Sequence, residues 1–109
     1  MKKFVALVLC ALMMLTFACV AMAESESITI AVVYSDTVDD KGWCQSMDTG
    51  VKVAQEALAA EGVTLEYTPV ESVAVSDAVS VLEQLVENYD IIIVHGAQFN
   101  AAVTEVAEE

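Results

Sequence analysis

The sequence predicts an α/β fold in three layers, with a parallel sheet of strand order 2-1-3 between helices. Three short runs rich in apolar and β-branched residues have the composition of buried parallel strands. Each run is followed by a stretch in which apolar residues recur at helical spacing. Because the connections are short, this β-α-β-α-β-α order favours right-handed crossovers and helices on both faces of one sheet.

The first strand is expected at 28–34, where apolar residues follow one another on both faces. After a polar loop, a helix begins at Trp43 or at the glycine before it, because apolar residues then recur on one face as far as Leu58. Asp40 lies just before this helix and can accept hydrogen bonds from the backbone N–H groups of its first turn. Gly62 is expected to end the helix in a left-handed conformation.

The second strand is expected at 63–70, and Pro69 near its end favours an edge position. An apolar stripe over 75–89 predicts the second helix. The four apolar residues at 91–94 are typical of a central strand covered on both faces, and a third helix starts near Gln98. Placing the most apolar strands centrally gives the order 2-1-3.

This order brings the turns after the first and third strands, 39–45 and 95–100, to one end of the sheet. Open α/β sheets bind ligands in the crevice beyond the carboxyl ends of their strands. Trp43 offers a flat apolar face there, the alternative being that it covers the core. Gly96 would let backbone N–H groups approach a ligand closely, the alternative being a glycine that only forms the turn.

The amino-terminal segment predicts export. Two lysines, an apolar run at 4–20 and small residues ending at Ala23 make residues 1–23 a secretory signal peptide, cleaved after Ala23. The run is long enough to span a bilayer, so an uncleaved anchor is the alternative. Lipid attachment at Cys19, as in bacterial lipoproteins, is a second alternative. We therefore expect a periplasmic or surface-associated protein whose folded part is 24–109.

The composition after Ala23 excludes several classes of protein. All 17 acids lie after Ala23, and only two lysines remain there, which gives a net charge of −15. The negative electrostatic field of this part repels nucleic acid and anionic membranes. Of three cysteines only Cys44 remains, which excludes an intramolecular disulfide and a zinc site. The chain stops inside a helical pattern, so we expect it to be the first, truncated part of a larger protein.

Three groups with possible chemical roles, an acidic cluster, His95 and Cys44, can each also be explained as structural. Four acids gather near the first turn: Asp36, Asp39, Asp40 and Asp48. A cation site would use such carboxylates, but their spacing does not match an EF-hand, and helix capping with solvated loop charge is favoured. His95 could bind a ligand or act as a base, and hydrogen bonding to a nearby backbone group is favoured. Cys44 is interpreted as a small packing residue at a ligand-facing position, since nearby acids oppose a reactive thiolate.

The segment VDDKGWCQS, residues 38–46, followed by Gly50, resembles the first turn of the basic membrane protein (BMP) family. These are extracytoplasmic solute-binding proteins of ABC importers and include nucleoside-binding, PnrA-like lipoproteins. NYDIII at 88–93 stands where the family has Gly-Tyr-Asp and an apolar strand, and 95–99 matches its glycine and phenylalanine turn. The resemblance covers 28–109, about a quarter of a family member.

The resemblance implies the N-terminal lobe of a type I periplasmic-binding fold, which has two Rossmann-like lobes with the ligand between them. In nucleoside-binding members the aromatic residue of the first turn stacks on the purine, and Trp43 occupies that position. Two departures, Cys44 in place of an asparagine and an unusual His95, leave the ligand identity open. The candidate ligand-binding residues are Asp40, Trp43, Cys44, Gln45, Gly96 and Phe99.

The function expected is that of a solute-binding component of an ABC importer, which binds a nucleoside or similar flat neutral solute by lobe closure and delivers it to a membrane permease. No enzyme activity, cofactor, metal or nucleic-acid partner is expected. The alternatives are a ligand-sensing extracellular domain of a signalling receptor, a secreted nucleoside hydrolase, which would need a base or metal cluster, and a truncated piece without function of its own.

Overall fold

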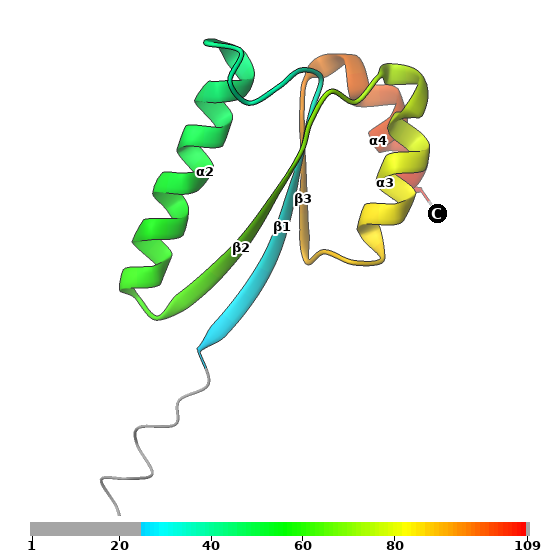
Figure 1. The fold of residues 1–109 in the computed structure, drawn as a ribbon. Helices are drawn as coiled ribbons and strands as arrows, with labels where there is room; N and C mark the ends of the chain where they lie inside the picture. Colours follow the sequence, from blue (N-terminus) through cyan, green and yellow to red (C-terminus); the bar gives the residue numbers. More distant parts are fainter. Residues whose placement is uncertain (1–24, 109) are drawn as a thin grey trace, which may run out of the picture.

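Three parallel strands form the centre of the computed structural model, which describes residues 25–108 (Figure 1). The elements are β1 (Glu26–Tyr34), α2 (Trp43–Ala60), β2 (Val63–Val70), η1 (Val75–Asp77), α3 (Ala78–Val86), β3 (Ile91–His95), η2 (Ala97–Phe99) and α4 (Asn100–Ala107). The strand order β2-β1-β3 confirms the predicted order 2-1-3. The predictions for the leader, with cleavage after Ala23 and lipid at Cys19, lie outside the described residues.

The strand β1 is the buried centre of the sheet. Its residues 30–34 are buried, and it pairs in parallel with both neighbours. In the ladder with β3, Tyr34 lies opposite His95, the last residue of that strand. The carboxyl ends of β1 and β3 therefore coincide, which brings the turns that follow them together at one edge.

The prediction of a central position for the strand at 91–94 is wrong for the described residues. Among residues 25–108, β3 pairs only with β1 and lies at an edge, and its first residue, Ile91, is 43% exposed. The apolar run has another cause: Ile92 and Val94 pack on one face of the sheet and Ile93 on the other. The edge position predicted for β2 from Pro69 is confirmed.

Alternate residues of β1 point into two hydrophobic cores, one on each face of the sheet. The α2-side core contains Ile30, Val32, Tyr34, Cys44 and Val51. The α3–α4-side core contains Val33, Val73, Ala78, Leu82, Phe99 and Ala102. Figure 1 shows α2 on one side of the sheet and α3 with α4 on the other, which is the predicted three-layer arrangement.

The end of α2 follows the prediction. Gly62 has a φ of 86°, a left-handed conformation that glycine adopts without a Cβ penalty, and its N–H donates to the Ala59 carbonyl at 3.1 Å. The chain then turns directly into β2.

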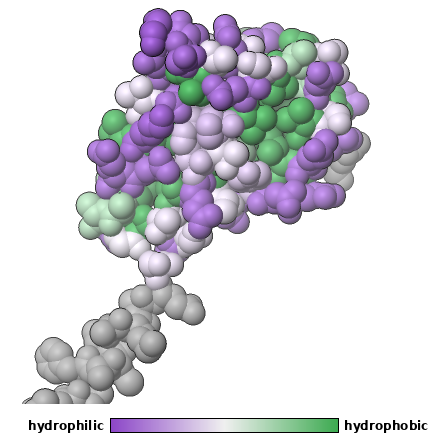
Figure 2. Space-filling view, in the orientation of Figure 1, coloured by the Kyte–Doolittle hydropathy of each residue, from purple (hydrophilic) through white to green (hydrophobic). Residues whose placement is uncertain are grey.

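The surface mixes hydrophilic side chains with a hydrophobic area beside α3, visible in Figure 2. Large apolar side chains that remain exposed include Val86 on α3 and Val103 on α4. Within residues 25–108, none of the helices combines the length and the hydropathy that a bilayer crossing demands.

Candidate ligand-binding site

Trp43 and His95 come together at the carboxyl edge of the sheet, as the strand order predicts. Trp43 is the first residue of α2, and its side chain is 66% exposed. The imidazole of His95 stacks on the indole with ring centroids 4.6 Å apart and planes 18° from parallel. His95 Nε2 lies 3.1 Å from the Trp43 carbonyl oxygen, and it donates because a carbonyl can only accept. The expectation that a backbone group satisfies His95 is therefore confirmed.

Asp40 holds the start of α2. Its Oδ1 accepts from the N–H of Gly42 at 2.8 Å and of Gln45 at 3.1 Å, and its Oδ2 accepts from the N–H of Cys44 at 3.0 Å. Hydrogen bonds from Gln45, Gly42 and Cys44 lower the pKa of Asp40 to about 2. The predicted capping role is confirmed, and it fixes the backbone on both sides of Trp43.

A second acid, Glu71, organises the loop before Asp40. Its Oε1 accepts from the Val38 N–H at 2.7 Å, which ties the β1–α2 loop to the residue that follows β2. Two backbone bonds reinforce the link, from Ser72 N–H to the Asp36 carbonyl at 3.2 Å and from Val73 N–H to the Tyr34 carbonyl at 2.9 Å. We did not predict this role for Glu71, although its position directly after a parallel strand could have indicated it.

Gln45 borders an open polar hollow beside the first turns of α2. The hollow has a volume of about 430 Å³ and is lined by Lys41, Gly42, Gln45, Ser46 and Thr49. Gln45 is half-buried. Its position at a ligand cleft stays a prediction.

Gly96 makes the turn that follows β3. Its φ of 151° lies in a region that side chains rarely adopt, and an added Cβ would stand 2.5 Å from the Gln98 Oε1 atom. Its carbonyl accepts from the Phe99 N–H at 3.2 Å, which closes the turn. The close approach of a ligand to this backbone also stays a prediction.

Two of the candidate residues, Cys44 and Phe99, have buried side chains in the described part of the chain, and their position at a ligand cleft stays a prediction. Phe99 is 0% exposed because the turn η2 directs its ring into the α3–α4-side core. Cys44 is 1% exposed and packs in the α2-side core. Burial raises the pKa of the Cys44 thiol, so it stays protonated at neutral pH and is a packing residue.

Asp48 belongs to a buried polar chain and not to the acidic loop. It is 5% exposed and accepts from the Tyr67 hydroxyl at 2.9 Å and from Lys52 Nζ at 2.7 Å. Because the single proton of Tyr67 is directed to Asp48, Tyr34 donates to Tyr67 over 2.7 Å. Burial is the main cause that raises the pKa of both tyrosines. The Tyr34 ring meets the His95 ring edge-on at 5.7 Å, so the chain reaches the candidate site.

Three of the four acids of the first turn have separate hydrogen-bond partners. Asp40 caps the helix, Asp48 is buried in the polar chain, and Asp36 accepts from the Thr37 N–H at 2.8 Å. Within the part of the chain that the structure describes, no three His, Cys, Asp or Glu residues are placed to hold a metal ion.

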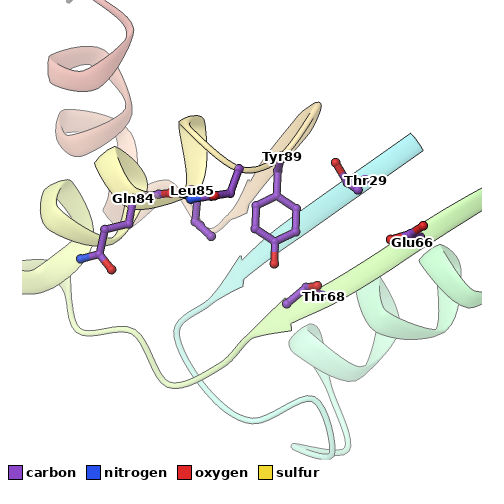
Figure 3. A pocket seen from close by; sticks show the side chains of 7 residues that line it. Thr29, Glu66, Thr68, Gln84, Leu85 and Tyr89 are labelled. Atoms are coloured by element: carbon purple, nitrogen blue, oxygen red, sulfur yellow. Dashed lines mark hydrogen bonds between the residues drawn. The ribbon is translucent and has the colours of Figure 1, made fainter. Parts of the chain in front are cut away.

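A larger hollow, of about 510 Å³, lies on the opposite face of the sheet (Figure 3). It is lined by Thr29, Glu66, Thr68, Gln84, Leu85, Asn88 and Tyr89. Several of its polar groups are already engaged: Thr29 with Asp90, Glu66 with Ser27, and Asn88 with the Gln84 carbonyl. The lining residues include neither Trp43 nor any other residue of α2, so this hollow is separate from the edge that carries Trp43.

Comparisons with known proteins agree with this fold. Residues 27–109 match the Bmp family, described as ABC transporter substrate-binding protein PnrA-like. A solved ABC transporter solute-binding protein from Conexibacter woesei DSM 14684 is similar with a TM-score of 0.60 and 18% identity, covering 74% of this chain and 26% of that chain. No curated protein matches the chain. This chain spans about a quarter of that structure's length and has its fold. With the family match over nearly all the described residues, the chain belongs to the Bmp family of PnrA-like ABC transporter substrate-binding proteins.

Proposed function

We propose that this chain provides one wall of the ligand cleft in an exported solute-binding component of an ABC importer. The observation that carries the proposal is Trp43, an indole that is 66% exposed at the carboxyl edge of a parallel sheet. Parallel α/β sheets bind ligands at that edge. One face of the indole is covered by His95, and the ring is otherwise accessible to a flat ligand.

The ligand class that fits this surface is a nucleoside or a similar flat neutral solute. Stacking on an exposed indole requires a planar partner, and it is tolerant of the identity of the base. Gln45, half-buried two residues after Trp43 and lining the polar hollow there, is the residue we propose to hydrogen-bond the solute beside the stack. The 17 acids and two lysines after residue 23 disfavour free phosphates, because the field of the lobe repels anions.

The mechanism is binding followed by closure of a second lobe over the solute, with the closed form then presented to a permease in the membrane. The leader at 1–23 supports an extracytoplasmic location. Two groups at this edge that could react are already engaged: Asp40 accepts from three backbone N–H groups, and the Cys44 thiol is buried.

A thermal-shift assay of the full-length protein against a panel of nucleosides, free bases and nucleotides tests the ligand class. A nucleoside at 100 times its Kd is expected to stabilise the folded state by about 2.7 kcal/mol, which raises the melting temperature. Nucleotides are expected to give smaller shifts at low ionic strength, because the acidic lobe repels phosphate. If no nucleoside raises the melting temperature, the proposed ligand class is wrong.

A further inference from the structure

We infer that His95 is a positioning residue for Trp43: it holds the indole as a platform with one face closed and the other available to a single planar ligand. The inference rests on the proposed function, because it concerns the same stacking surface. Trp43 stands at the first position of α2 with most of its side chain in solvent. An unsupported exposed side chain loses rotamer freedom when a ligand orders it, and this loss weakens binding.

The contact between the two rings supplies that support. The imidazole lies 4.6 Å from the indole centroid and nearly parallel to it, so it covers one face of the ring. The same imidazole donates from Nε2 to the Trp43 carbonyl at 3.1 Å. His95 therefore holds both the backbone and the side chain of Trp43, and the bond to the carbonyl fixes which ring nitrogen carries the proton.

His95 is itself held by the sheet. It ends β3, where it is paired with Tyr34 in the β1 ladder. The ring of Tyr34 meets the imidazole edge-on at 5.7 Å with planes 68° apart. Tyr34 is 0% exposed, and its hydroxyl is hydrogen-bonded to Tyr67 at 2.7 Å. The support for the exposed indole thus begins in a buried hydrogen-bonded chain, and groups on rigid strands hold a site more accurately than groups on loops.

The face of the Trp43 indole that His95 covers, its inner face, is closed to a ligand. A planar solute can stack on the outer face of Trp43 but cannot insert between Trp43 and the sheet, because the imidazole occupies that space. The platform therefore offers a single face, on which one ring system can stack. Removing the imidazole is expected to leave the indole exposed but mobile, with lower affinity for the same ligands.

The test compares His95→Ala with His95→Phe, which retains a flat ring but lacks the Nε2 donor. Fluorescence anisotropy of the ligand-free full-length protein is measured, and the Trp43 signal is isolated by subtracting the spectrum of a Trp43→Phe variant. Anisotropy of Trp43 is expected to fall in His95→Ala and to recover for the most part in His95→Phe. Nucleoside affinity is expected to fall about 2- to 10-fold in His95→Ala and to recover for the most part in His95→Phe, as the anisotropy does.

Two results would overturn the positioning role. One is unchanged anisotropy and affinity in His95→Ala. The other is lost affinity with unchanged anisotropy, which would mean that His95 contacts the ligand directly. If the wild-type protein binds no nucleoside, the proposed function fails, whereas the anisotropy comparison still supports or overturns the role of His95.

Discussion

The two faces of the sheet are stabilised in different ways. Among residues 25–108, the buried side chains of the α3–α4-side core are all apolar, and Phe99 is one of them. The α2-side core contains a chain of hydrogen bonds that joins Asp48, Tyr67 and Tyr34. Apolar packing is non-directional, whereas a hydrogen-bonded chain fixes the orientation of each ring in it. The face with directional contacts is also the one that supports Trp43 through His95.

The two aromatic residues that follow the strands at this edge also differ. Trp43 follows β1 and projects into solvent, whereas Phe99 follows β3 and is completely buried. Similar residues in similar turns thus have opposite surroundings, and we expect different roles for them: ligand binding for Trp43 and core packing for Phe99. Mutations on each face should separate these roles.

The largest effect is expected from Phe99→Ala. Removing a completely buried ring leaves a cavity in the α3–α4-side core and should lower the free energy of unfolding by about 3–5 kcal/mol, measured by urea denaturation. Val103→Ala on α4, where the side chain is 39% exposed, is the matched control and should cost far less. A loss under about 1 kcal/mol for Phe99→Ala would show that the ring does not hold this core.

Tyr67→Phe should break the polar chain of the other face. Asp48 loses a donor while still buried, and Tyr34 loses its acceptor, so the free energy of unfolding should fall by about 1–3 kcal/mol. The control Tyr89→Phe removes a hydroxyl beside the hollow of Figure 3 and should cost under about 0.5 kcal/mol. Equal costs for the two variants would contradict a structural role for the chain.

Gly96→Ala addresses the turn where the two faces meet. The φ of 151°, which residues with a Cβ rarely adopt, predicts a loss of about 1–3 kcal/mol in the free energy of unfolding. Gly50→Ala is the matched control, because this helical glycine has open space around it and alanine should stabilise α2 by about 0.5–1 kcal/mol. If Gly96→Ala and Gly50→Ala shift the melting temperature in the same direction, the expected difference between the two glycines is wrong.

The smallest effect is expected at Asp40, and it should depend on pH. Because backbone hydrogen bonds lower the pKa of Asp40 from 3.8 to about 2, the folded state favours the carboxylate. The stability that this carboxylate contributes is complete above pH 3.8 and is lost as the pH falls through about 2. Asp40→Asn should therefore lower the melting temperature at pH 7 and have little effect near the folded pKa.

The matched control for Asp40 is Asp39→Asn, which removes a charge from the adjacent, exposed loop position. It should change the melting temperature less than Asp40→Asn at pH 7. If Asp40→Asn lowers the melting temperature equally at pH 7 and near pH 2, the charge of Asp40 is not the cause of its stabilising effect.

The features that were predicted correctly depend on local pattern or on topology. Asp40 before a helical stripe predicted the cap, and the 2-1-3 order predicted that the turns after β1 and β3 meet. The direction of Phe99 was not predictable, because a turn of a few residues decides whether an aromatic ring points to solvent or to the core. The role of Asp48 was missed because its partner Tyr67 lies 19 residues away, and only the fold brings the two together.

Calorimetric titration of the full-length protein and its Trp43→Ala variant with the same nucleoside tests the central claim most directly. Loss of the stacking platform should weaken binding by about 1–3 kcal/mol, while the melting temperature of the ligand-free protein stays nearly unchanged because the indole is 66% exposed. Val53→Ala, at a position of α2 that is 61% exposed, should keep wild-type affinity. Equal affinity in Trp43→Ala and wild type would contradict the account and return Trp43 to a structural role.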